Sequence, residues 1–268
     1  MSIPDTGPSA GHVTLKAAAG TAGMVDPRGL RRSWELLQAF RLEQSDPEHF
    51  YSRLADDALA QVRRFAPVDG QVVLDVGGGP GYFAAAFRSA GATYIPLEYD
   101  FRELSARDVI DPAALIGDGM RLPVRSGSVD ICYSSNVLEH VPRPWDMAAE
   151  MIRVLRPGGT AFLSFTNWLS PFGGHETAPW HYFGGEYAAR RYERRTGHAP
   201  KNRYGRSLFP VSVGGALAWA RGRADVEMVA ALPRYYPDWS RRLVAVPGLR
   251  EIASWNLLLV LRPCSASR

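Results

Sequence analysis

The sequence predicts an α/β fold in which helices cover both faces of a mostly parallel sheet. Three observations support it. The apolar run Val72–Val76 leads directly into glycines, as a buried strand before a tight turn does. Strand-like and helix-like segments then alternate as far as Thr166, a pattern typical of parallel sheets. Two more apolar runs follow with no strong helix between them, which predicts an antiparallel pair at the sheet edge.

Hydrophobic periodicity and breaker residues define the expected elements. Asp46 and Pro47 mark a helix start, and the segment Arg156–Gly159 ends a helix. Helices are expected at residues 31–42, 50–65, 81–89, 102–108, 144–155, 187–196 and 211–221. Strands are expected at residues 72–76, 93–97, 113–116, 129–134, 160–166, 226–232 and 254–262.

The length of 268 residues, with 46% hydrophobic and 22% charged residues, suits one compact domain with additions. Residues 1–29 are rich in Gly, Ala, Ser and Pro, and we expect a disordered leader there, not a signal peptide. The domain then covers residues 30–268. It includes a helical N-terminal cover (30–66), an insertion after the fifth strand (167–206) and a C-terminal strand pair (224–262).

Charge and cysteine usage narrow the functional classes. The net charge is +4, and all basic residues except Lys16 and Lys201 are arginine. Arginines in residues 190–195 either meet an anionic group of a substrate or form a solvated helix face. We expect no nucleic-acid partner, because no basic–aromatic RNA-binding signature is present. Cys132 lies in an apolar run and is expected to be a buried free thiol, which favours a reducing, cytoplasmic location.

No apolar stretch approaches the roughly 20 residues that a membrane-spanning helix needs. Peripheral contact with a membrane stays open, since residues 232–256 combine aromatic residues, prolines and arginines. The same segment could also help form a substrate site or cover the sheet edge. The sequence does not indicate an oligomeric state.

A glycine-rich turn joins the first predicted strand to its helix. Gly77, Gly79 and Gly81 allow a sharp bend and let a ligand approach the main chain, next to the free N–H groups of a helix N-terminus. The dinucleotide fingerprint G-x-G-x-x-G fits poorly, because its third glycine would fall at Tyr82. Glu98 ends the second strand, where an acid can accept hydrogen bonds from ribose hydroxyls; Asp100 is the competing candidate.

These motifs resemble those of class I S-adenosylmethionine-dependent methyltransferases, of the methyltransferase type 11 kind. The resemblance extends from Val72 to Trp168. It rests on "VVLDVGGGPGYF", "PLEYD", "GDGMRLPVRSGSVDICYSSNVLEHV" and "EMIRVLRPGGTAFLSFTN" in this order. It implies a Rossmann-like seven-stranded sheet whose last strand is antiparallel, with S-adenosyl-L-methionine as cofactor. Gly78 and Pro96 depart from the usual pattern, since proline is unusual in a buried strand.

The resemblance also implies residue roles. Asp75 and the glycine turn would approach the methionine part of the cofactor, and Asn136 would lie near the same end. Glu98 would hold the ribose, and Tyr99 would pack on the adenine. Asp118 would accept from the adenine amino group. The full implied cofactor set is Asp75, Gly77, Gly79, Gly81, Glu98, Tyr99, Asp118, Gly119, Met120 and Asn136.

The sulfonium methyl group is already activated, so a general base is needed only for a poor nucleophile such as an alcohol hydroxyl. His140 lies one helical turn after Asn136, which makes it one candidate base. His175 and His181 lie in the insertion, a stretch rich in glycine and aromatic residues that reads as a substrate lid or as a self-packed loop. We expect no metal there, because His175, Glu176 and His181 lack the metalloprotease spacing.

The predicted function is methyl transfer to a small or medium-sized acceptor, with O-methylation of a sugar, glycolipid or other alcohol preferred. Two alternatives remain: a catalytically inactive module that binds S-adenosylmethionine, and methylation of a quinone-like or polyketide-like acceptor. A nicotinamide oxidoreductase is disfavoured by the glycine spacing.

Overall fold

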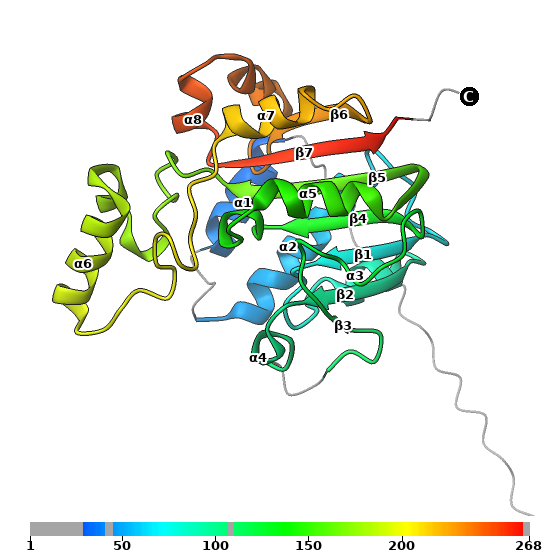
Figure 1. Cartoon of the computed structure of the whole chain (residues 1–268), viewed down its shortest axis with the longest axis horizontal. Coiled ribbons are helices and arrows are strands. Elements are labelled where there is room, and N and C mark those ends of the chain that lie inside the picture. The colour runs from blue at the N-terminus through cyan, green and yellow to red at the C-terminus, as the bar shows by residue number, and fades with distance from the viewer. Residues whose placement is uncertain (1–28, 41–44, 107–109, 265–268) are drawn as a thin grey trace, which may run out of the picture.

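The computed structural model describes residues 29–40, 45–106 and 110–264. Its centre is one seven-stranded sheet of order β3-β2-β1-β4-β5-β7-β6 (Figure 1). The strands are β1 (Val72–Val76), β2 (Thr93–Glu98), β3 (Leu115–Ile116), β4 (Val129–Ser135), β5 (Leu155–Thr166), β6 (Val226–Pro233) and β7 (Asn256–Pro263). The first five pair in parallel, whereas β7 is antiparallel to both β5 and β6. The predicted fold class and the antiparallel closing pair are confirmed. The last strand, β7, lies between β5 and β6, so β6 forms the edge of the sheet.

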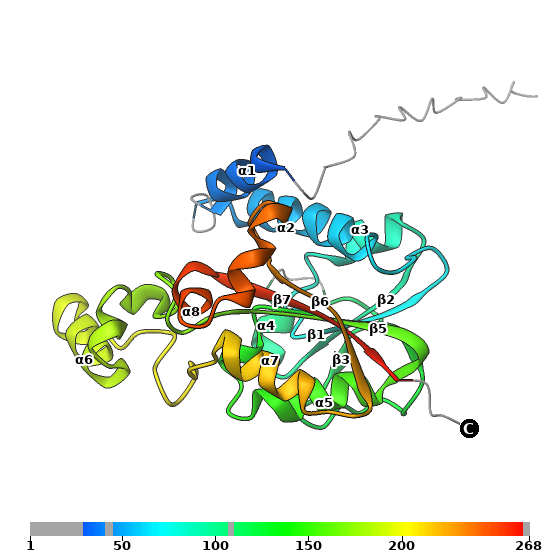
Figure 2. The same cartoon turned by 90° about the horizontal axis from the view of Figure 1, so that it is seen from above.

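Helices pack on both faces of this sheet (Figure 2). The described helices are α1 (Leu30–Phe40), α2 (Pro47–Val62), α3 (Ala84–Ser89), α4 (Phe101–Leu104), α5 (Pro144–Arg153), α6 (Gly185–Thr196), α7 (Val213–Arg221) and α8 (Leu249–Ala253). Short 3-10 helices add η1 (Leu138–His140), η2 (His175–Thr177), η3 (Trp180–Phe183) and η4 (Asp238–Ala245). Among the described residues, no helix is both long enough and apolar enough to cross a membrane.

Strand alternation divides the buried side chains into two cores. Ile131 and Phe162 point to the face covered by α2 and α3, together with Phe87. Cys132 and Leu163 point to the face covered by α5 and α7. Cys132 is buried and has a free thiol, as predicted.

Several element boundaries differ from the expected ones. The third helix begins at Ala84 instead of residue 81, because the turn still has Gly81 at φ 79°. Helix α4 ends at Leu104, and residues 107–109 lie outside the description. Strand β3 is only two residues long, since the Asp111 carboxylate accepts from the Ala113 N–H and holds a turn before it. The predicted leader, apart from Gly29, also lies outside the described residues.

The segment Arg156–Gly159 was expected to precede the fifth strand, yet β5 already begins at Leu155. Helix α5 ends at Arg153 because the Val154 carbonyl accepts from the N–H groups of Ser128 and Val129, which starts pairing with β4. The register then shifts between Val129 and Ile131, so the segment forms a bulge with Gly158 at φ 81°.

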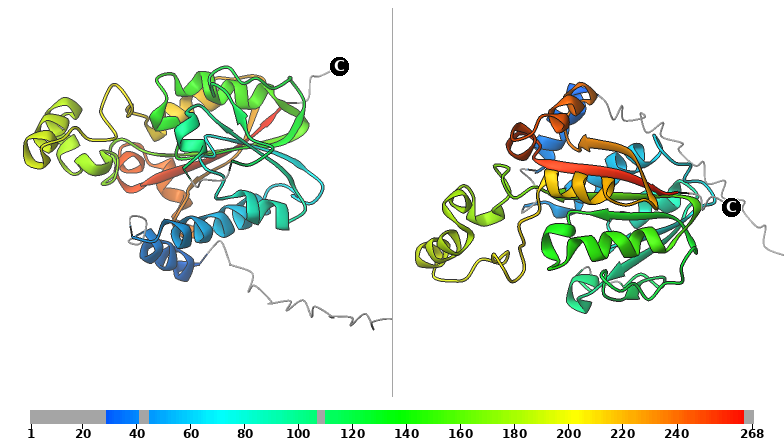
Figure 3. Two further views of the ribbon diagram at one scale, coloured as in Figure 1. Left: turned by 90° about the horizontal axis from the view of Figure 1, so that it is seen from below. Right: turned by 45° about the horizontal axis from the view of Figure 1, so that its top comes forward.

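The carboxyl ends of β1, β2, β4 and β5 meet at one edge of the sheet, where ligands of such folds bind. The insertion leaves this edge after β5, and α6 extends away from the sheet in every view (Figure 3). The antiparallel direction of β7 brings its first residue, Asn256, to the same edge, together with the end of β6.

Candidate active site

The glycine turn after β1 is a tightly bonded loop. The N–H groups of Gly77 and Gly78 donate to the Leu97 carbonyl at 2.8 and 3.3 Å, which ties the turn to the end of β2. Gly77 has φ 78°, and a Cβ added there would lie 2.4 Å from a methyl carbon of Val137. Gly79 has φ 52° and open space beside it, so a ligand can reach its backbone.

Glu98 reaches from β2 into this turn. Its Oε2 accepts from the Gly79 N–H at 3.1 Å, and its Oε1 accepts from the Tyr99 N–H at 2.8 Å. These two bonds hold the carboxylate at the end of its strand, where a diol of a ribose could bind. Tyr99 follows with its side chain 74% exposed, so one face of its ring is open for a base.

The two departures from the usual family pattern lie against each other. A Cβ on Gly78 would lie 3.0 Å from the Asp75 carboxylate and 3.3 Å from Pro96, so glycine leaves room for both. In β2 the backbone groups of Thr93 and Leu97 form their hydrogen bonds on the side of β1. Because successive residues of a strand alternate in direction, the backbone of Pro96 faces β3. Strand β3 pairs only with Leu97 and Glu98, and therefore needs no donor from the proline.

Asp75 is buried at the end of β1. The Tyr94 hydroxyl donates to its carboxylate, while burial, together with the nearby Glu98 charge, raises the pKa of Asp75 to about 7. A carboxyl with such a pKa changes its charge near neutral pH.

Asp118, Gly119 and Met120 form the other wall of the expected cofactor site. The Met120 N–H donates to Asp118 Oδ1 at 2.8 Å, which fixes the carboxylate in a turn. A Cβ on Gly119 would lie 3.2 Å from Val76 and 3.3 Å from the Met147 sulfur, so the backbone sits directly on the core.

Asn136 follows β4 in a left-handed conformation, with φ 57°. Its Oδ1 accepts from Asn256 Nδ2 at 2.7 Å, and its Nδ2 donates to the Tyr235 hydroxyl at 3.3 Å. The end of β6 and the start of β7 therefore complete the edge formed by β4.

Arg234, beside Tyr235, is a fully buried cation at the same edge. Its guanidinium donates to the hydroxyl groups of Ser135 and Ser164 at 2.6 Å and of Tyr133 at 2.9 Å. Its Nε has no hydrogen-bond partner among the described residues. Sequence reasoning missed Arg234, Tyr235 and Asn256 as site residues. A sequence signal was present: Arg234 directly follows the apolar run of β6, and Asn256 directly precedes the apolar run of β7.

The three candidate bases have different surroundings. His140 Nδ1 lies 2.8 Å from the Ser207 carbonyl, so this nitrogen carries the proton and Nε2 is free to accept one. The rings of His140 and His175 stack with centroids 5.1 Å apart. Burial, followed by the nearby His140, lowers the pKa of His175 to about 4, so this ring is neutral near pH 7.

His181, the third candidate base, is bonded within the insertion. Its side chain is buried, its Nε2 lies 3.1 Å from the Ser170 carbonyl, and its ring packs over Gly174 and against Trp168. Glu176 binds the backbone and side-chain amides of Asn202 at 2.7 and 2.9 Å. Both residues therefore connect parts of the insertion to each other.

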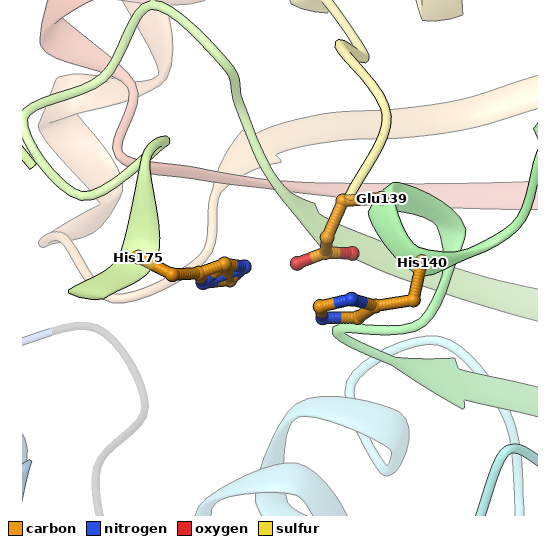
Figure 4. Close-up of side chains that lie close together, drawn as sticks. All are labelled: Glu139, His140 and His175. Carbon is orange, nitrogen blue, oxygen red and sulfur yellow. The ribbon is translucent and has the colours of Figure 1, made fainter. Parts of the chain in front are cut away.

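Glu139 joins His140 and His175 instead (Figure 4). Its Oε1 accepts from the Thr166 N–H at 2.8 Å, and burial raises the pKa of its carboxyl group. Thr166 Oγ1 lies 3.5 Å from Asn256 Nδ2, which also bonds Asn136. A short series of contacts thus connects this group with the expected cofactor site.

The fold is Rossmann-like, and proteins with such sheets bind their ligands at the carboxyl ends of the strands. Residues 74–163 match the methyltransferase domain family. An uncharacterised methyltransferase of Mycobacteroides abscessus is 55% identical over 247 residues, which cover 87% of this chain and 95% of the relative. A counterpart from Mycobacterium marinum is 52% identical over 244 residues, with the same shares.

Two solved structures share the fold. An S-adenosylmethionine-dependent methyltransferase from Mesorhizobium loti has a TM-score of 0.53 at 19% identity, covering 78% of this chain and 97% of that one. A TehB-like methyltransferase from Corynebacterium glutamicum has a TM-score of 0.50 at 16% identity, covering 88% and 100%. The chain belongs to the class I S-adenosylmethionine-dependent methyltransferases, and S-adenosylmethionine is its cofactor.

Proposed function

We propose that the protein transfers the methyl group to a hydroxyl of a small or medium-sized polar acceptor, such as a sugar, a glycolipid or another alcohol. The observation that carries this proposal is the group of Glu139, His140 and His175 beside the cofactor edge. An alcohol hydroxyl is a weak nucleophile near neutral pH and must lose its proton as it reacts. His140 would accept that proton through Nε2, since its Nδ1 is already bonded to the Ser207 carbonyl.

The residues at the strand ends fit the cofactor. Glu98 offers its carboxylate to the ribose, Tyr99 an open ring to the adenine, and Asp118 a carboxylate to its amino group. Arg234 Nε and Asn256 Oδ1 are buried polar atoms without partners among the described residues, and both can bind the amino-acid end. When bound, S-adenosylmethionine supplies an activated methyl group.

The insertion has the composition of an acceptor-binding wall. The side chains of Tyr182 and Phe183 are 48% and 73% exposed, and Arg191 lies 3.8 Å over the Trp180 ring. Flat rings bind sugar faces and other apolar surfaces, whereas the exposed arginines of α6 suit an anionic group.

The test is a methyl-transfer assay with isotope-labelled S-adenosylmethionine and a panel of sugars, glycolipids, simple alcohols, quinols and amines. The position of the label is then found by mass spectrometry. We expect the label on oxygen of an alcohol, with kcat lowered about 100-fold or more in His140→Ala and nearly unchanged in His198→Ala. Label only on carbon or nitrogen, or cofactor binding without transfer to any acceptor, would contradict the proposal.

A further inference from the structure

Glu139, His140 and His175 each offer one ligand atom, and these atoms all lie within 4.8 Å of one another. Figure 4 shows the carboxylate close to both imidazole rings. We propose that this triad binds a divalent transition-metal ion, for which Zn²⁺ is the best match. Binding of the ion does not depend on the proposed O-methylation. A role of the ion in activating the acceptor hydroxyl does rest on that proposed function.

The first argument is that two of the three ligands are already oriented. Metal-binding histidines commonly donate their second ring N–H to a carbonyl or carboxylate, which leaves the other nitrogen free for the ion. His140 makes such a bond, with Nδ1 2.8 Å from the Ser207 carbonyl. Glu139 is held through Oε1 by the Thr166 N–H, and its carboxylate lies close to both imidazole rings.

The second argument comes from buried polar atoms that lack partners. Glu139 Oε2 and His175 Nε2 are both buried, and neither forms a hydrogen bond with the part of the chain that is described. Burying a polar atom without a partner lowers stability. One cation between them would satisfy both atoms and neutralise the buried carboxylate as well.

The third argument is the backbone at His175. This residue has φ 47°, a left-handed conformation that non-glycine residues seldom adopt and that often occurs at functional sites. The His175 N–H donates to the Phe172 carbonyl at 2.9 Å, and Figure 4 shows the ring pointing toward Glu139 and His140. Ligand atoms with bonds of about 2.0–2.1 Å stand closer together than 4.8 Å, so ion binding draws His175 inward.

The donor set favours zinc over magnesium or calcium. Two imidazoles and one carboxylate form a typical catalytic zinc site, which leaves a fourth position open, while magnesium and calcium prefer oxygen ligands only. An ion here would take the acceptor hydroxyl oxygen in the open position. His140 would then be a ligand through Nε2 and could not also be the base, so the hydroxyl proton would leave to water. The electron pair of the broken O–H bond would form the bond from oxygen to the methyl carbon, while the carbon–sulfur bond breaks and S-adenosylhomocysteine leaves.

The experiment uses the full chain without a histidine tag, stripped with a chelator and titrated calorimetrically with ZnCl₂. Visible absorption of added Co²⁺ reports coordination independently of activity. We expect one ion per chain, with affinity lowered about 100-fold or more in His175→Ala and Glu139→Gln. His198→Ala removes an exposed histidine as the matched control and should leave binding unchanged. Thermal unfolding of each variant, with His175→Gln as a second substitution, separates loss of the site from loss of the fold.

Absence of stoichiometric binding, or equal binding by the triad variants, would overturn the proposal and indicate surface ions only. If methyl transfer needs His140 but persists in excess chelator, the ion has no part in catalysis, and the proposed O-methylation is not contradicted. Zinc binding by the triad with no alcohol accepted would leave the ion site standing and overturn the proposed function.

Discussion

The cofactor side and the insertion, which is the proposed acceptor side, differ in where their hydrogen bonds lead. At the cofactor side, loops bond to neighbouring strands, as in the bonds from Gly77 to Leu97 and from Asn136 to Ser164. In the insertion, several bonds join two parts of the insertion itself, as in Thr177 to Gly174, His181 to Ser170 and Glu176 to Asn202. One substitution should therefore disable the cofactor side, whereas the acceptor side can change residue by residue.

The largest effect is expected from Gly77→Ala. The new methyl group meets Val137 at 2.4 Å and the residue must keep φ 78°, so we expect S-adenosylhomocysteine affinity to fall about 100-fold or more by calorimetry. Gly70→Ala is the matched control, because Gly70 has φ 71° and open space around it. Equal losses in both variants would show that backbone conformation alone matters.

The next largest effect is expected from Glu98→Gln. If Glu98 binds the ribose as proposed, loss of its charge weakens those hydrogen bonds, and binding of S-adenosylhomocysteine should fall about 10- to 100-fold. Glu103→Gln changes an exposed acid on α4 and should leave the affinity within about twofold. An unchanged affinity in Glu98→Gln would assign the ribose to another acid, with Asp100 the first candidate.

Asp75 should affect stability with a defined sign. Its folded pKa of about 7 exceeds the model-peptide value of 3.8, so the folded state binds more protons between these values. The stability that Asp75 contributes is then full below pH 3.8 and declines as pH rises to about 7, by at most about 1.4 kcal/mol per pH unit. Asp75→Asn should remove this decline in urea unfolding measured across the range. Tyr94→Phe, which keeps the carboxyl group, should retain the decline.

The smallest effect is expected in the insertion. Glu176→Gln weakens two hydrogen bonds to Asn202 and should lower the free energy of unfolding by about 1 kcal/mol in urea. Cofactor affinity should stay unchanged while the acceptor KM rises. A loss of cofactor affinity as large as that of Glu98→Gln would mean that the two sides are not held independently.

The features that the sequence predicted well are local ones. The glycine turn, Glu98 at the end of β2 and the helix start at Asp46 each depend on neighbours along the chain, and the structure has all three. The roles of these residues toward the cofactor remain predictions.

The features that the sequence did not predict depend on distant partners. Arg234 and Asn256 reach the site only because β7 lies between β5 and β6. His175 meets His140 through an irregular loop that no periodicity describes. That Glu139 Oε2 is buried without a partner among the described residues, close to His175, is visible only in three dimensions.

The place of β7 also bears on how the protein is made. Synthesis runs from N-terminus to C-terminus, yet β7, the last described strand, must pair between two strands that the ribosome has already released. The glycine turn and Glu98 emerge long before it, but Asn256 and the final position of Arg234 do not exist until β7 is released. A nascent chain therefore carries the recognisable cofactor motifs while it still lacks a complete binding edge, and ligand binding can stabilise only chains whose synthesis has passed this strand.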